Sequence, residues 1–395
     1  MKTFHCDNCG QLVFFENVSC ERCGAPLGYL PEIGEIGAFE VDATSGNWRS
    51  LHPETRDKLY RPCKNYSVEN VCNWMVPAES EAAFCASCAL TETIPDLSVP
   101  ENRPLWYRTE VAKRRLLYTL TMLGLPVESR LEQPNGMSFA FKASTDAEPV
   151  MTGHANGLIT LNLAEADDAE RERVRAQLHE PYRTLVGHFR HEIGHYYFDR
   201  LVVGTHWNEP FRERFGDERA DYQAALDHHY QNGAPAGWED NYVSEYATMH
   251  PWEDWAETWA HYLHIVDTLD TANACGLVLD PDDDSLPHLD DQTSVDEASF
   301  GNLMRRWFPL TYALNSLNRS MGVPDAYPFA LSPTVVSKLR FVHKVIAEAR
   351  AAAPEDAGGA RAVGSEDDTE SRGDAPAGAA PNAGQADVKA GAPAA

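Results

Sequence analysis

Beyond residue 105, apolar residues recur mostly at the three-to-four-residue spacing of amphipathic helices. A first helix is predicted over residues 105–123, before a shorter stretch with a different pattern. Past residue 167 the helical pattern dominates, and it predicts helices over residues 167–180, 182–202, 210–231, 252–270, 296–320 and 333–351. We therefore expect this part of the chain to be mostly helical.

The residues between the first predicted helix and the later ones show the pattern of short β-strands. It contains "GMSFAFK" and "VMTGHANGLITLNLAEAD". In the second segment "ANG" is a turn signal, because Asn and Gly tolerate the positive φ angles of tight hairpins. A hairpin is predicted there, with its later strand at residues 158–163. Together, these patterns predict an α+β body with a small antiparallel sheet.

The cysteines divide the chain, because eight of the nine fall between residues 6 and 88. We assign residues 1–92 to a cysteine-rich head, the proline-rich residues 93–104 to a linker and residues 105–352 to the body. Residues 353–395 are acidic and rich in Ala, Gly and Pro, with no aromatic residue. That tail cannot build a core and is expected to be disordered.

Charge narrows the possible partners. The formal net charge of −27 disfavours nucleic-acid binding, because the chain would repel phosphate groups. The N-terminus lacks the apolar core of a signal peptide, and no run of about 18 apolar residues predicts a membrane span. We expect a cytoplasmic protein with neither a membrane nor a nucleic-acid partner. Thiols stay reduced in the cytoplasm, so the clustered cysteines are expected to bind metal.

Two copies of C-x-x-C-G open the head. They contain Cys6, Cys9, Cys20 and Cys23. Each pair can supply two corners of a tetrahedral site, and the glycine permits the tight turn around the thiolates. This pattern resembles a zinc ribbon, so we predict a first structural zinc site.

A second cysteine set follows in the head. It contains Cys63, Cys72, Cys85 and Cys88. We predict a second structural zinc site, with small buried core residues as the alternative for the first two cysteines. Four thiolates leave no open position for catalysis, so the head is expected to be a structural platform that could recruit a partner or a substrate.

The body contains His-Glu-x-x-His within "HFRHEIGHYYFD", residues 188–199. His191 and His195 are four residues apart, so on a helix both imidazoles face one way and can bind one Zn²⁺. Glu192 can reach a water molecule on that metal. Asp199, four residues beyond His195, is expected either to orient that histidine or to cap the end region of the helix. Gly194 is expected to let another element approach the helix closely.

A catalytic zinc site needs a third protein ligand. The segment "GDERAD" offers Asp217, Glu218 and Asp221, and "HPWEDWAETWAHYLH" offers Glu253 and Glu257. The two glutamates are four residues apart, so one could bind the metal while the other accepts the N–H of a zinc-bound histidine. The tryptophans around them predict a buried helix, where carboxylates need partners.

H-E-x-x-H followed at long spacing by E-x-x-A-[DE] resembles the gluzincin metallopeptidases. "SEYATMHPWEDWAETWAHYLH" is also similar to the catalytic region of lethal-factor-like members. The cysteine head with this body resembles a bacterial family of zinc-binding metallopeptidases that carry an N-terminal zinc-ribbon domain. That resemblance covers about residues 1–350. It implies His191, His195 and Glu253 as ligands of a catalytic zinc, Glu192 as general base and Glu257 as the support of a ligand.

The resemblance also implies an oxyanion donor at Tyr246, seven residues before Glu253, with His250 or His261 as alternatives. In gluzincin-like folds an edge strand binds extended substrate, and residues 158–163 are expected to form it. We therefore expect a peptidase that acts on peptide or protein substrates, with one catalytic and two structural zinc ions. The competing interpretation is a catalytically idle zinc-binding adaptor.

Overall fold

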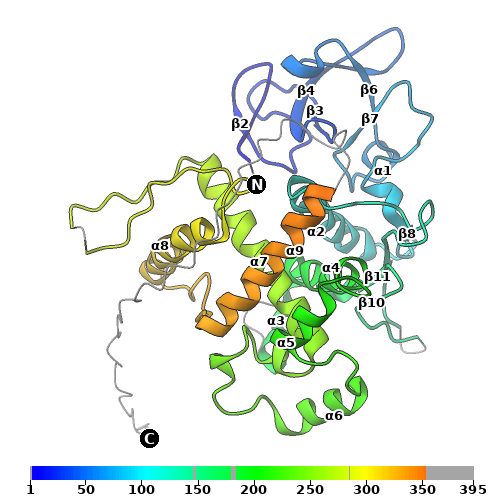
Figure 1. The fold of residues 1–395 in the computed structure, drawn as a ribbon. Helices are drawn as coiled ribbons and strands as arrows, with labels where there is room; N and C mark the ends of the chain where they lie inside the picture. The colour runs from blue at the N-terminus through cyan, green and yellow to red at the C-terminus, as the bar shows by residue number, and fades with distance from the viewer. Residues whose placement is uncertain (1, 146–147, 179–183, 284, 353–395) are drawn as a thin grey trace, which may run out of the picture. The chain divides into compact units, whose positions relative to one another are not determined.

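The computed structural model describes residues 2–145, 148–178, 184–283 and 285–352 (Figure 1). The described residues lie in one compact unit. The predicted disordered tail, residues 353–395, lies outside the described residues. None of the described helices combines the length and the apolar character that a bilayer crossing requires.

The head is rich in strands. A two-stranded antiparallel ladder pairs β1 (Phe4–His5) with β2 (Leu12–Val13). A five-stranded antiparallel sheet has the order β3-β4-β5-β6-β7. Its strands are β3 (Leu27–Leu30), β4 (Glu35–Val41), β5 (Trp48–Ser50), β6 (Leu59–Pro62) and β7 (Met75–Pro77). The short helix α1 (Lys64–Ser67) lies between β6 and β7 in the chain.

A short strand follows the head, and residues 94–101, which form no helix or strand, connect it to the first helix of the body. β8 (Thr91–Thr93) pairs in parallel with β9 (Ser138–Lys142). Helix α2 (Asn102–Met122) begins three residues before the predicted position. Within the predicted linker at residues 93–104, the first residue ends β8, residues 94–101 form no helix or strand, and the last three residues open α2.

The body sheet has the order β10-β11-β9-β8. β10 (Gly153–Ala155) and β11 (Leu158–Asn162) pair antiparallel, whereas β11–β9 and β9–β8 are parallel. The predicted turn is confirmed, since Asn156 and Gly157 have φ angles of 50° and 79°. The prediction of an antiparallel sheet is wrong for the two parallel pairings.

The predicted edge strand at residues 158–163 is also wrong. β11 lies between β10 and β9, so β10 forms that edge of the sheet. The alternating burial along β11 shows that one of its faces is covered. Such a pattern carries no information about which strands lie beside it.

The helical prediction for the body is largely confirmed. After α2 the helices are α3 (Asp168–Leu178), α4 (Leu185–Leu201), α5 (Asn208–Phe215), α6 (Tyr222–Asn232), α7 (Pro251–Ala274), α8 (Phe300–Ser320) and α9 (Pro333–Ala352). The single helix predicted over residues 210–231 is two helices. α5 ends just before Gly216, which has a φ of 104°, and the side chain of Asp221 caps α6 by accepting the N–H of Ala224.

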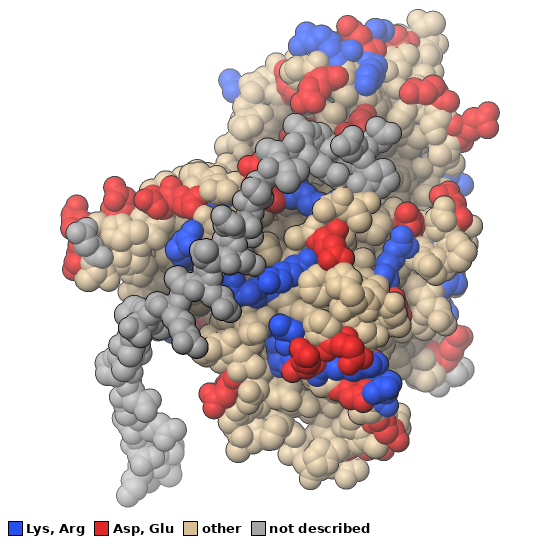
Figure 2. Space-filling model, viewed as in Figure 1, with Lys and Arg blue, Asp and Glu red and all other residues tan. Residues whose placement is uncertain are grey.

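Acidic side chains gather on the long loop between α7 and α8, at the left of Figure 2.

The pair of α4 and α7 positions the site. The indole N–H of Trp255 donates to the carbonyl of Gly194 at 2.8 Å. A Cβ at Gly194 would lie only 3.1 Å from the Cα of Ala256. The close approach predicted at this glycine is confirmed, and it brings one face of each helix into direct contact.

Candidate metal centre

Three side chains from the contact between α4 and α7 converge on one point. His191 and His195 lie on α4, and Glu253 lies in the first turn of α7. The two Nε2 atoms are 3.2 Å apart. Glu253 Oε2 lies 2.9 Å from Nε2 of His191 and 3.4 Å from Nε2 of His195. The three residues form a group that could hold one metal ion.

The donor set fits a cation. His191 Nδ1 lies 2.7 Å from a carboxylate oxygen of Glu257, which accepts a hydrogen bond from Nδ1 and so leaves Nε2 as the nitrogen that could bind a metal. Glu253 Oε2 is buried and has no hydrogen-bond partner among the described residues. The Nε2 atoms of both histidines and this carboxylate oxygen could therefore share one bound cation. Imidazole nitrogen and carboxylate oxygen are both ligands that Zn²⁺ accepts.

Further side chains hold these groups in place. The hydroxyl of Tyr222 donates to Glu253 Oε1 at 2.9 Å, and the hydroxyl of Ser244 donates to Glu257 Oε2 at 2.6 Å. The ring of Trp252 lies 3.6 Å from the ring of His195, between centroids. The tryptophan belongs to the aromatic set that predicted a buried helix, whereas the tyrosine and the serine were not predicted from the sequence. The tyrosine and the serine lie 31 and 13 positions from their partners and belong to no motif, so no local signal identifies them.

Two candidates from the sequence do not take part. Asp199 is exposed, and His195 Nδ1 has no hydrogen-bond partner in the described part of the chain, so the expected orienting bond is not formed. Asp217 lies in the turn between α5 and α6, where it pairs with Arg219 at 2.8 Å. Hydrogen bonds from Arg219 hold the pKa of Asp217 well below its usual range. Since its side chain is 52% exposed and engaged elsewhere, Asp217 does not join the ligand group.

A cavity of about 530 Å³ opens beside the metal ligands. Glu192 and Tyr246 both line it, together with His191 and Glu257. Glu192 is only 9% exposed, and no described residue forms a hydrogen bond or ion pair with its carboxylate. That carboxylate is therefore open to a molecule inside the cavity.

Tyr246 is the best placed of the predicted oxyanion donors. Its ring lies 5.9 Å from that of His191. Burial, and then the charge of Glu253, raise the pKa of Tyr246, so the phenol keeps its proton and can donate it in a hydrogen bond. His250 is occupied in capping α7 through the N–H of Trp252. His261 lines the cavity, and its Nδ1 is paired with the hydroxyl of Tyr327 at 2.7 Å.

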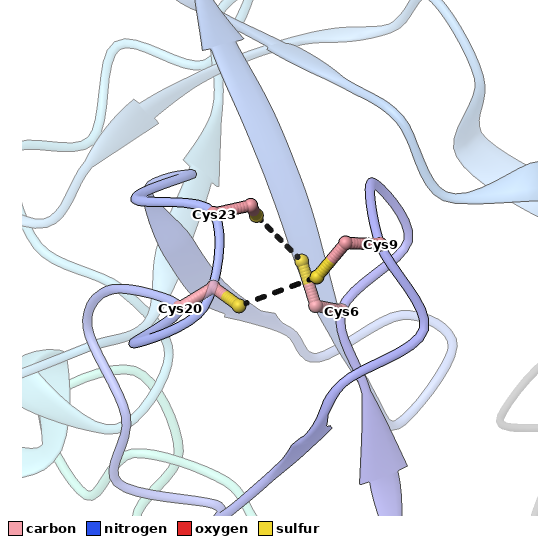
Figure 3. Close-up of side chains that lie close together, drawn as sticks. All are labelled: Cys6, Cys9, Cys20 and Cys23. Atoms are coloured by element: carbon pink, nitrogen blue, oxygen red, sulfur yellow. Dashed lines mark hydrogen bonds between the residues drawn. The ribbon is translucent and has the colours of Figure 1, made fainter.

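The first cysteine set converges on one point. Figure 3 shows the four side chains pointing toward one another from two loops, with Cys6 3.6 Å from Cys23 and Cys9 3.6 Å from Cys20, between sulfur atoms. The glycine after each pair has a positive φ angle, 72° for Gly10 and 73° for Gly24, as the tight turn requires. The group fits a tetrahedral zinc site of four thiolates.

The second cysteine set also forms a compact group. All four thiols are buried and close enough to bind one ion. The N–H of Cys85 donates to the sulfur of Cys63, and the N–H of Trp74 donates to the sulfur of Cys72, both at 3.3 Å. Such bonds stabilise thiolates, so Cys63 and Cys72 belong to the site and are not merely small core residues.

Comparison with known proteins assigns the family. Residues 102–345 match the model of a family described as "putative zinc-binding metallo-peptidase", and residues 3–99 match a zinc-ribbon domain. The chain belongs to this metallopeptidase family. Uncharacterized proteins of Mycobacterium bovis and of Mycobacterium tuberculosis are 44% identical to it over 350 residues, which cover 88% of this chain and 96% of each relative. No solved structure matches the chain. The family and the zinc-ribbon head expected from the sequence are thus confirmed.

Proposed function

We propose that this metallopeptidase-family protein hydrolyses peptide bonds, with Glu192 as general base. The observation that carries the proposal is the free Glu192 carboxylate, which lines the same cavity as His191, one of the candidate metal ligands. Binding of zinc alone needs only His191, His195 and Glu253. An additional buried carboxylate without a partner is unfavourable for folding, which favours a catalytic role.

Each residue has a separate task in the proposed reaction. Zinc held by His191, His195 and Glu253 would polarise the scissile carbonyl and acidify a water molecule. Glu192 accepts the proton of the attacking water and passes it to the leaving amine. The Tyr246 hydroxyl donates a hydrogen bond to the developing oxyanion.

An extended peptide could bind along the outer edge of β10. Met151 and Thr152 precede this strand and line the cavity, so the edge leads directly to the site. A Cβ at Gly153 would meet nothing within 4 Å, which leaves room for a neighbouring backbone. Strand addition would hold the peptide through its main chain and leave its side chains for selection.

We further propose three zinc ions per chain, one at the centre between α4 and α7 and one in each cysteine set. A cytoplasmic location would suit the eight clustered thiols, which must stay reduced to bind metal.

The test is Glu192→Gln with zinc counted alongside activity. Glutamine has nearly the shape of glutamate but cannot accept the proton, so peptide hydrolysis should fall by at least about 10²-fold. Zinc content should stay at the wild-type value, since Glu192 is not a ligand. Exposed Glu297→Gln serves as the matched control and should change neither quantity. Loss of zinc together with activity would show a structural role for Glu192. Zinc-loaded wild-type protein that cleaves nothing in a diverse peptide library would favour the idle adaptor.

A further inference from the structure

We infer that the substrate is a cationic peptide that places one large apolar side chain in the cavity and a basic residue at its mouth. This inference rests on the proposed peptidase function and names the substrate class of the same site. It is carried by two features of the cavity: an uncharged apolar floor and an acidic rim without basic residues.

The floor is apolar and closed. Val243 and Ala260 are buried there, and the half-buried ring of Phe329 lies 4.4 Å from the ring of His261, between centroids. Burial lowers the pKa of His261 to about 4, so the imidazole is neutral near pH 7. An acidic substrate side chain would lose its hydration on such a floor and would find no basic lysine or arginine in the lining.

The size of the cavity favours a large side chain. Its volume of about 530 Å³ falls within the roughly 300–1,000 Å³ typical of ligand pockets. An alanine or serine side chain would leave most of that space unfilled. Aromatic and large aliphatic side chains gain most from removal of their surface from water.

The rim of the cavity, unlike its floor, is acidic. Glu239 and Glu245 line the cavity and are exposed, and no described residue forms an ion pair with either. None of the described residues that line the cavity is Lys or Arg. The rings of Tyr230 and Trp238 stand on the same lining and could stack against a cation.

Charge complementarity therefore selects a basic residue for the rim. An acidic peptide would meet Glu239 and Glu245 there and the carboxylate of Glu192 further in. The chain as a whole has a net charge of −27, which further favours cationic over anionic ligands. A lysine or arginine can rest its alkyl chain on the aromatic rim while its charge stays in water near the carboxylates.

The experiment uses a series of labelled peptides on one backbone. The pocket position is Phe, Ala or Asp, and the neighbouring positions are Lys or Glu. For each peptide, kcat/KM is measured with the wild type and Kd with zinc-loaded Glu192→Gln. The Phe/Lys peptide should exceed the Asp/Glu peptide by at least about tenfold in both measurements, since exposed ion pairs and one apolar side chain each contribute.

Variants separate the floor from the rim. The double variant Glu239→Gln/Glu245→Gln should lower the preference for lysine by roughly three- to tenfold. The double variant Glu40→Gln/Glu297→Gln changes the net charge equally but lies outside the lining, so it should keep the preference. Ala260→Phe should fill the floor and remove the preference for a phenylalanine peptide over an alanine peptide.

The outcomes distinguish this inference from the proposed function. Cleavage that depends on Glu192 but shows no preference, or a preference for acidic peptides, overturns the inference and leaves the peptidase intact. Binding with the expected preference but without any cleavage would contradict the proposed peptidase function and support the inferred preference for cationic peptides. Neither cleavage nor selective binding overturns both.

Discussion

Glu257 shows how one side chain outside the ligand set can control the metal centre. One of its oxygens lies 2.7 Å from His191 Nδ1, and the other accepts the hydroxyl of Ser244 at 2.6 Å. Burial opposes ionisation, yet the hydrogen bond with His191 holds the pKa of Glu257 well below its usual range. The ionised carboxylate fixes both the tautomer and the ring orientation of His191.

We predict that Glu257→Gln lowers the zinc affinity of this centre by about 10- to 100-fold. Glutamine keeps the shape of the glutamate side chain, but its uncharged amide accepts a weaker hydrogen bond from Nδ1 of His191. Competition with a chelator of known affinity measures the effect, and Glu297→Gln is the matched control. Unchanged affinity would show that His191 is oriented by packing alone.

Tyr246→Phe tests the oxyanion role. The hydroxyl is the only group removed, so zinc content should stay constant while kcat falls by about 10²- to 10³-fold. Tyr312→Phe on α8, at a side chain 58% exposed, should have no effect on either. Full activity in Tyr246→Phe would shift the search for the donor to other cavity residues.

Among the site residues, only those governed by helix periodicity could be placed from the sequence with their neighbours. His191 and His195 are four apart on α4, and Glu253 and Glu257 are four apart on α7, so each pair shares a face. The contacts of Tyr222 and Ser244 depend on the path of the chain between those helices, which no local pattern contains.

At the scale of the elements, the structure depends on how closely α4 and α7 pack. The contact point is Gly194, where a Cβ would lie 3.1 Å from the backbone of Ala256 and 3.2 Å from Trp259 Cβ. These neighbours are backbone and the base of a buried side chain, so neither can yield easily. The separation of the two helices sets the distance between the histidines and Glu253.

Gly194→Ala should therefore destabilise the fold by about 1–3 kcal/mol and weaken zinc binding at the same centre. The control is Gly301→Ala on α8, where a Cβ would meet nothing closer than 3.8 Å. That change should be neutral or slightly stabilising, because alanine favours a helix over glycine. Chemical denaturation and zinc titration of both variants provide the comparison. Equal stability of the two would contradict the importance of this contact.

The sequence placed most helices to within a few residues and failed where tertiary pairing decides. The break between α5 and α6 had a local signal, since Gly216 follows the end of one helix and Asp221 caps the next. Both residues lie in the "GDERAD" segment that offered candidate metal ligands. No local pattern in the sequence indicated the order of the strands in the body sheet. β9 joins β11, near in the chain, to β8, which follows the last cysteine of the head.

At the scale of the whole described unit, the second cysteine set is built into the body. Arg114 of α2 is almost fully buried and donates to the carbonyl of Val71 at 2.8 Å, next to Cys72. Lys113 pairs with Glu110 at 2.9 Å and donates to the carbonyl of Ser87 at 3.0 Å. Breaking such buried polar contacts is costly, so metal binding in this set should stabilise α2 and β8 as well as the head.

We predict that Cys85→Ala removes the second structural zinc and lowers the melting temperature of the entire unit, catalytic centre included. Structural zinc contributes roughly 10–16 kcal/mol in small zinc-finger peptides, comparable to the roughly 5–15 kcal/mol that stabilises a typical domain. Scanning calorimetry should show one cooperative transition at a lower temperature, together with zinc loss at the His191 centre on heating. Cys275→Ala, at an exposed free cysteine outside both sets, should melt like the wild type. Two separate transitions in Cys85→Ala, with the body melting at the wild-type temperature, would show that β8 and α2 hold the body without this zinc.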